Sequence, residues 1–248
     1  MKIIGSDYDG TLNYNGIDER KLSAIARWRE AGNIFALISG RGPDSVLELY
    51  EEKKFGCDYL IANNGAVIMK TDGTVEFSAR CDGSLAVPVL KHMFENGCPW
   101  GHVQTSFDCR VFANKEDCTK ADEYTLDDMP EVEWFTQIST LLPDFETSAK
   151  VTASLCEAFG DKLNPLQNGE CIDTVRADIN KAEGLYRLIE LLGASKEDVI
   201  AVGDNVNDRD MIAEFRSYAM ANGVDSIKAL ADYITPGIAE LIEEELAE

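Results

Sequence analysis

The stretch SDYDGTL at residues 6–12 follows an apolar pair near the start of the chain. This order predicts a short buried strand that runs directly into two carboxylates, Asp7 and Asp9. Residues two apart in a strand point the same way, so both carboxylates can converge on one small volume. Close carboxylates disfavour each other's ionisation, which calls for a nearby cation or a retained proton. The stretch therefore indicates a metal site with an acid/base group, or else a plain turn, in which Asp-Gly and a capping Asp are common.

A second apolar run, ALISGR at residues 36–41, predicts a strand that ends in a hydroxyl, a glycine and a guanidinium. Ser39 and the neighbouring backbone N–H groups can bind an oxyanion, because Gly40 lets the backbone approach closely. A serine-type turn is the alternative. Further along, Lys181 follows Asn180 at the start of an expected helix. A lysine is unfavourable at that positive helix end, so it indicates an anion opposite, unless it is an ordinary surface lysine.

The stretch VIAVGDNVND at residues 199–208 predicts another buried strand, which delivers a carboxylate at its end. Asp204, Asp208 and the amide of Asn207 offer hard oxygen ligands, which suit Mg²⁺ rather than zinc. Asp208 alone has a simpler interpretation as a helix N-cap. Asp204 has no such interpretation, because it follows the apolar strand directly.

Strand-like runs alternate with helical periodicity over both ends of the chain, which predicts an α/β fold with a parallel sheet covered on both faces. Strands are expected at residues 2–6, 34–39, 59–62, 198–202 and 218–220, with a hairpin at 67–77. Helices are expected at residues 18–31, 43–53, 181–192, 208–215, 224–231 and 238–247.

The pattern changes between about residues 80 and 180, where strands with one polar face predominate. Strands are expected there at residues 101–106, 109–113, 133–140 and 170–175, and helices at 84–96 and 144–159. Such alternation predicts an open antiparallel sheet that carries helices on one side. We therefore expect a core domain made of residues 1–79 and 181–248, interrupted by an α+β domain of residues 80–180.

Composition excludes several classes of function. The formal net charge of −22 argues against nucleic acid and anionic membranes as partners. No apolar run approaches the roughly 18 residues that span a bilayer, and no secretory signal is visible. The seven cysteines are scattered without CxxC pairs, which favours reduced thiols and a cytoplasmic protein.

The candidate groups all follow strands or begin a helix at one edge of the expected sheet, where open α/β sheets bind ligands. The chain resembles the haloacid dehalogenase (HAD) superfamily of phosphotransferases in DYDGT at 7–11, SGR at 39–41, the helix-starting Lys181 and GDNVND at 203–208. NNGA at 63–66 and MANG at 220–223 are similar to the Cof-type sugar phosphatases. In that subfamily an α/β cap of the C2 type is inserted between the second and third motifs, where residues 80–180 lie. The resemblance thus implies a Rossmann-like HAD core with a parallel sheet and an inserted α+β cap that selects the substrate.

The resemblance also implies a chemistry: a Mg²⁺-dependent phosphomonoester hydrolase for sugar phosphates or other small phosphorylated metabolites. Asp7 would be the nucleophile that forms an aspartyl-phosphate, and Asp9 the general acid/base. The other implied roles fall into three groups. Ser39 and Lys181 would hold the phosphoryl oxygens, Gly40, Arg41, Asn64 and Asn207 would bind substrate, and Asp7, the backbone carbonyl of Asp9, Asp204 and Asp208 would bind the metal.

Two departures from the family pattern stand out: a serine at position 39 where threonine is commoner, and Ala-Glu-Gly-Leu after Lys181 where Gly-x-Ala-Leu is usual. A phosphomutase would carry the same motifs, and a non-catalytic sugar-phosphate-binding protein is a further alternative. A response-regulator receiver is disfavoured because Asp7 lies so near the N-terminus, and no P-loop is present. We expect a monomer or small homo-oligomer. Polar cap residues, namely His92, His102, Gln104, Arg110 and Lys115, are candidates for contacts with the leaving group.

Overall fold

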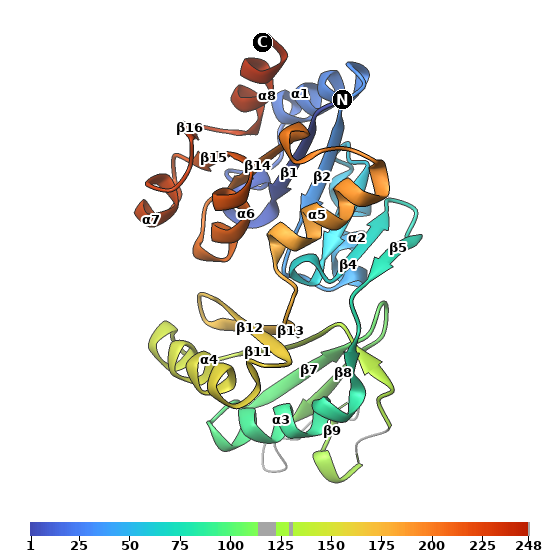
Figure 1. Ribbon diagram of the computed structural model, residues 1–248, viewed down its shortest axis with the longest axis vertical. Helices are drawn as coiled ribbons and strands as arrows, with labels where there is room; N and C mark the ends of the chain where they lie inside the picture. Colours follow the sequence, from blue (N-terminus) through green and yellow to red (C-terminus); the bar gives the residue numbers. More distant parts are fainter. Residues whose placement is uncertain (114–122, 129–130, 248) are drawn as a thin grey trace. The chain divides into compact units, whose positions relative to one another are not determined.

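The computed structural model describes residues 1–113, 123–128 and 131–247 (Figure 1). Its internal contacts divide the chain into two compact units, one of Met1–Phe77 with Asn180–Glu248 and one of Ser78–Ile179. These borders lie close to those expected at 79/80 and 180/181. The predicted α/β class is confirmed, with a large and mainly parallel sheet in the first unit. No helix in the described ranges has the length and apolar character that a membrane crossing requires.

The first unit is built on an eight-stranded sheet in the order β16-β15-β14-β1-β2-β3-β4-β5. Its strands are β1 Ile3–Asp7, β2 Ile34–Ile38, β3 Tyr59–Ala62, β4 Val67–Lys70, β5 Val75–Ser78, β14 Val199–Gly203, β15 Arg216–Met220 and β16 Tyr233–Thr235. Neighbouring strands from β16 to β3 run parallel, and β4 runs antiparallel to β3. The chain leaves β1 toward β2 on one side and returns as β14 on the other. This reversal makes the carboxyl end of β1 the switch point of the sheet.

Helices cover both faces of this sheet (Figure 1). They are α1 Glu19–Glu30, α2 Pro43–Lys53, α5 Lys181–Leu192, α6 Arg209–Glu214, α7 Asp225–Lys228 and α8 Ile238–Ala247. In β2, Phe35 and Leu37 pack with α1, α2 and α8, whereas Ala36 and Ile38 pack with α5, α6 and α7. Both sides of each central strand are therefore buried, which explains why these strands appear in the sequence as continuous apolar runs.

The second unit contains a six-stranded sheet in the order β12-β13-β11-β7-β8-β9. Its strands are β7 Trp100–Gln104, β8 Cys109–Ala113, β9 Glu123–Tyr124, β11 Gln137–Leu141, β12 Leu163–Asn168 and β13 Cys171–Arg176. All neighbours are antiparallel except β8 and β9, which are parallel. Two helices, α3 Ala86–Glu95 and α4 Phe145–Phe159, share one apolar core with the sheet. The expected open sheet with helices on one side is thus present.

Several elements differ from expectation. The strand expected at 133–140 is two strands: β10 Trp134–Phe135 pairs with β6 Cys81–Asp82, and β11 joins the large sheet. Between them the chain is fixed at Thr136, whose N–H and hydroxyl both donate to the Gln104 carbonyl, at 2.7 and 3.0 Å. The edge strand β12 was not expected because Pro165 and polar residues weaken its pattern, but an edge position tolerates proline. The helix expected at 224–231 is shorter in the structure, where α7 covers only Asp225–Lys228.

Candidate active site

Three neighbouring strands deliver polar residues to one place. Asp7 is the last residue of β1 and pairs with Ile38 of β2, so Ser39 lies next to it. On the other side of β1, Ser6 pairs with Val202 of β14, and Asp204 follows that strand. The carboxyl edge of the sheet at its switch point therefore carries two carboxylates and a hydroxyl, as the sequence predicts.

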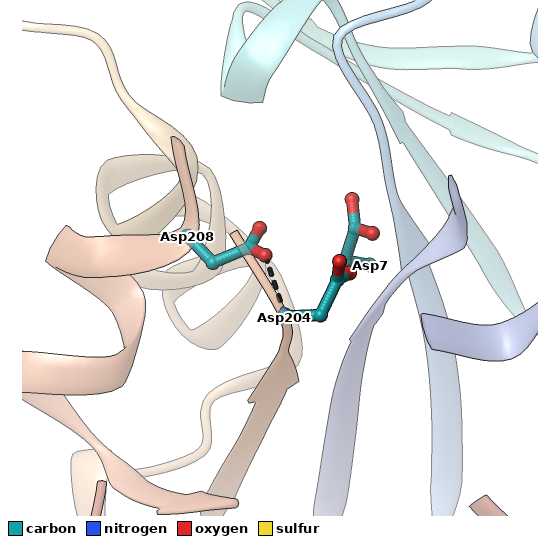
Figure 2. Close-up of side chains that lie close together, drawn as sticks. All are labelled: Asp7, Asp204 and Asp208. Atoms are coloured by element: carbon teal, nitrogen blue, oxygen red, sulfur yellow. Dashed lines mark hydrogen bonds between the residues drawn. The ribbon is translucent and has the colours of Figure 1, made fainter. Parts of the chain in front are cut away.

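Asp7, Asp204 and Asp208 form a carboxylate cluster. Each side chain offers one oxygen, and these three atoms all lie within 4.8 Å of one another. Figure 2 shows the Asp7 side chain on one segment of the chain and those of Asp204 and Asp208 on another, beside it. Asp208 is completely buried and Asp7 is nearly so. Three carboxylates this close, two of them buried, repel strongly, so the cluster requires positive charge or bound protons.

Lys181 supplies the cation that the structure shows. Its side chain is buried, and its Nζ donates hydrogen bonds to Asp7 Oδ1 and Asp208 Oδ1, each at 2.6 Å. Lys181 is the first residue of α5, whose N-terminus is capped by Asn180. The carboxylates offset the unfavourable interaction of the lysine with the positive helix end. One ammonium does not balance three carboxylates, and two negative charges remain in excess when all three are ionised.

The carboxylates are held in place by donors of the surrounding loops. Asp208 Oδ2 accepts from the backbone N–H groups of Asp204 and Asn205, at 2.9 and 3.0 Å, as the short helix Val206–Asp208 begins. Asp204 Oδ1 accepts from the buried Thr11 hydroxyl at 2.7 Å. Gly10 has a φ of +84°, and a Cβ there would lie 2.4 Å from Asp204 Oδ2. Only glycine therefore fits this position of the DYDGT stretch.

Burial dominates the protonation of the cluster. It raises the pKa of Asp7 to about 8, with Lys181 opposing the rise and Asp208 adding to it. Burial also raises the pKa of Asp204, although the Thr11 hydrogen bond opposes it. For Lys181, burial acts to lower the pKa, but Asp208 and Asp7 outweigh it and raise the pKa above its ordinary value. The ammonium stays charged, and the excess of carboxylate oxygens fits a hard divalent cation such as Mg²⁺.

The raised pKa of Asp7 predicts a pH-dependent stability for the metal-free protein. An unfolded aspartate titrates near pH 4, whereas the folded Asp7 has a pKa of about 8. Between these values the folded state holds a proton that the unfolded state has released. The stability that this group contributes is therefore complete below about pH 4 and is lost as the pH rises toward 8.

Unfolding temperatures in EDTA, compared between wild type and Asp7→Asn from pH 5 to 8, report on Asp7 and the groups coupled to it, because groups elsewhere in the protein titrate alike in both. We expect the wild type to lose stability relative to the variant as the pH rises. A difference that does not change with pH would contradict the raised pKa.

The remaining predicted residues surround the cluster in the adjoining loops. The buried Ser39 accepts a hydrogen bond from the Arg41 N–H at its Oγ (3.2 Å), and its carbonyl accepts from the Asn64 N–H (3.0 Å). Gly40 lies between Ser39 and Arg41, and Asn207 precedes Asp208 in its short helix. The Asp9 side chain is not part of the carboxylate cluster, because both of its oxygens accept from Arg41.

Sequence reasoning gave no individual role to two residues of the quoted motifs. Thr11 holds Asp204, and the Asn222 side chain donates to the Gly10 carbonyl at 2.9 Å. The position of each in its motif is the only signal that could have drawn attention to it, because both contacts join segments about 200 residues apart.

A close contact between two glycines sets the position of the helix that carries Lys181. A Cβ on Gly184 of α5 would lie 2.7 Å from the Gly65 Cα, and a Cβ on Gly65 would lie 2.3 Å from the Asn180 carbonyl oxygen. The loop Asn63–Gly65 and the first turn of α5 therefore pack backbone against backbone. This contact gives a physical reason for glycine at position 184, because a Cβ there would meet the backbone of Gly65.

Gly184→Ala is expected to lower the free energy of unfolding by about 1–3 kcal/mol, because the added methyl must push the loop and the helix apart. Urea unfolding measures the effect. Glu190→Ala, an exposed position of the same helix, serves as the control and should leave the stability unchanged. Wild-type stability in Gly184→Ala would show that the contact can relax without cost.

Comparison with known proteins identifies the family. Residues 4–240 match the model of the haloacid dehalogenase-like hydrolases. The 5-amino-6-(5-phospho-D-ribitylamino)uracil phosphatase YcsE of Bacillus subtilis is 28% identical over 246 residues, which cover 95% of this chain and 90% of YcsE. The phosphatase of the same name, YbjI, from Escherichia coli is 24% identical over 250 residues, covering 94% of this chain and 90% of YbjI.

Solved structures show the same fold. A haloacid dehalogenase-like hydrolase from B. subtilis superposes with a TM-score of 0.82 at 20% identity, covering 98% of this chain and 99% of that one. A sugar phosphatase of HAD subclass IIB superposes with a TM-score of 0.80 at 17% identity, with both chains fully covered. The chain belongs to the haloacid dehalogenase-like hydrolases of the Cof type, and it is a phosphatase.

Proposed function

We propose that this protein is a Mg²⁺-dependent phosphomonoester hydrolase that acts on small phosphorylated metabolites through an aspartyl-phosphate on Asp7. The observation that carries the proposal is the buried cluster of Asp7, Asp204 and Asp208 around Lys181 at the switch point of the sheet. Enzymes catalyse phosphoryl transfer mainly by positioning the reacting groups and neutralising their charge. The carboxylates and the ammonium of this cluster can do both.

In the first step, a carboxylate oxygen of Asp7 attacks phosphorus and the ester P–O bond breaks. Asp9 donates its proton to the departing alkoxide. In the second step, water attacks the phosphorus, Asp9 takes the proton from that water, and phosphate leaves as the Asp7 carboxylate is restored. Lys181 and the Ser39 hydroxyl with its adjacent backbone N–H hold the phosphoryl oxygens. An ammonium has three N–H donors, and Lys181 donates two of them to carboxylates. The third N–H can therefore be donated to a phosphoryl oxygen.

Asp7, Asp204 and the backbone carbonyl of Asp9 would hold the metal, with Asp208 and Asn207 in support. When bound, Mg²⁺ would supply the positive charge that the cluster lacks and neutralise the transferring phosphoryl group. Gly40, Arg41 and Asn64 shape the loops beside the phosphoryl site.

The names of the relatives support the class of substrate. YcsE and YbjI are phosphatases of a phosphorylated ribitylamino-uracil, and a phosphoglycolate phosphatase of Methanosarcina acetivorans is 42% identical over 71 residues, 26% of this chain. These substrates are small metabolites that share only the phosphomonoester. We therefore assign this class to the present protein without choosing one compound.

We further propose that the second unit selects the substrate, as a cap. Its sheet has α3 and α4 on one face, and the antiparallel register places Gln104, Gln137 and Asp173 together on the other. Gln137 Nε2 donates to Ser139 Oγ at 2.9 Å and to Asp173 Oδ1 at 3.2 Å. Gln104 Oε1 is buried and has no hydrogen-bond partner among the described residues, which indicates a place for a ligand donor.

The other candidates named from the sequence are distributed unevenly. The rings of His102 and Trp100 lie 4.5 Å apart on the same polar face as Gln104. His92 instead lies between α3 and α4, where it contacts Ser154 and Phe159. Arg110 is opposite Val103 in the register, on the helix-covered face, and pairs with Asp108. Lys115 lies outside the described residues.

A phosphate-release screen over sugar phosphates, short acid phosphates and nucleotides tests the proposed function. We expect hydrolysis of at least one small phosphomonoester, complete loss in excess EDTA, recovery with Mg²⁺ and inhibition by Ca²⁺. Gln104→Leu should change the ranking of substrates and leave the Mg²⁺ requirement intact. Full activity in EDTA would exclude the metal site, and an unchanged ranking would remove Gln104 from substrate selection.

A further inference from the structure

The acid/base candidate Asp9 is paired with a single partner. Arg41 Nε donates to Asp9 Oδ2 at 3.1 Å, and Arg41 Nη2 donates to Asp9 Oδ1 at 3.0 Å. This two-point contact fixes the plane of the carboxylate as well as its position. Within the described part of the chain, no other group donates a hydrogen bond to this carboxylate. Its orientation in this structure therefore depends on Arg41.

Arg41 is well suited to hold another side chain, because its own backbone is fixed. Its N–H donates to Ser39 Oγ at 3.2 Å, and its carbonyl accepts from the Asn63 N–H at 2.9 Å. The guanidinium carbon also lies 5.8 Å from the centre of the Tyr8 ring, within the range of a cation–π contact. The loop that contains Ser39 thereby fixes the backbone from which the Arg41 side chain extends.

Asp9 needs such support more than Asp7 does. Its side chain is 57% exposed, whereas Asp7 is buried and held by Lys181. An exposed carboxylate samples several rotamers unless a contact selects one, and a general acid must lie within hydrogen-bond reach of the proton it transfers. The backbone that follows Asp9 is already constrained, because Gly10 adopts a positive φ and its carbonyl accepts from Asn222.

We propose that Arg41 is a positioning residue for Asp9, rather than a direct ligand of the substrate as the sequence alone suggested. The inference rests on the proposed function, since it takes Asp9 as the acid/base. An exposed ion pair contributes little to folding, so its loss should act on the chemical step and not on stability. The effect should also be confined to reactions in which Asp9 transfers a proton.

The experiment compares single-turnover phosphorylation by wild type, Arg41→Met, Asp9→Ala and the double variant, with an alkyl phosphate and an activated aryl phosphate. We expect Arg41→Met to slow the alkyl ester about 10-fold or more and the aryl ester much less, because the aryl leaving group needs little protonation. In the Asp9→Ala background, Arg41→Met should cause almost no further loss. Arg41→Lys, which keeps the charge but not the two-point contact, should fall between wild type and Arg41→Met.

Arg29→Met is the matched control. Arg29 makes the same kind of two-point pair with Asp58, from Nε to Oδ2 at 3.1 Å and from Nη2 to Oδ1 at 2.7 Å, and is 40% exposed against 44% for Arg41. Its loss should leave both rates unchanged. Equal slowing by Arg41→Met with and without Asp9, or a need for more substrate to reach an unchanged maximal single-turnover rate, would overturn the inference and make Arg41 a substrate ligand. If Asp9→Ala itself leaves the alkyl ester rate unchanged, the acid role of Asp9 fails and the inference fails with it.

Discussion

Asp7→Asn is expected to lower turnover by about 10⁴-fold or more while leaving the protein folded. The amide keeps the shape of the side chain but cannot attack phosphorus, and losing a nucleophile costs more than losing any supporting group. Stability should be equal where Asp7 is protonated and higher as the pH approaches 8, because the variant cannot acquire the negative charge that the cluster disfavours. Phosphate release and thermal unfolding measure the two quantities.

The control for this change is Asp225→Asn, an aspartate that is fully exposed and paired with Lys228 at the surface. It should match the wild type in both assays. Turnover within a few fold of wild type in Asp7→Asn would exclude a covalent intermediate on this residue.

Lys181→Met is expected to cost about 3–5 kcal/mol of stability in the absence of divalent metal, since it leaves buried carboxylates without their cation. The side chain is 1% exposed and contacts two of the three carboxylates at 2.6 Å, so solvent cannot replace it. Turnover should fall by about 10²–10³-fold, because a donor to the phosphoryl group is lost. Urea unfolding in EDTA and phosphate release provide the measurements.

Lys196→Met removes a lysine of the same unit whose partner, Glu214, is 48% exposed, and it should leave the stability close to that of wild type. If Lys181→Met and Lys196→Met lose equal stability, the buried cluster does not depend on its ammonium.

Much of the fold could be predicted because the pattern of apolar residues in the sequence indicates most of its helices and strands. The central strands β2 and β14 carry no polar side chain, and α2, α5 and α8 have the bounds that periodicity and capping residues indicate. The strands of the second unit were harder to predict. One expected strand divides at Thr136 between two sheets, and Pro165 weakens the sequence pattern of the edge strand β12. Both outcomes depend on pairing with strands that are distant in sequence.

The candidate site shows the same division. Asp7, Asp204 and Ser39 could be predicted because each follows an apolar strand, and Lys181 because it begins a helix against the dipole. The pairing of Asp9 with Arg41, the support from Thr11 and the contact of Gly65 with Gly184 could not. Each of these depends on loop geometry, which hydrophobic periodicity does not record.

The central claim is that Asp7 carries the phosphoryl group during turnover. The most direct measurement is an acid quench during a single turnover, followed by borohydride reduction, which converts an aspartyl-phosphate to homoserine, and peptide mass spectrometry. We predict homoserine in place of aspartate at position 7 and at no other acidic position. Homoserine at another aspartate, or none during active turnover, would contradict the account.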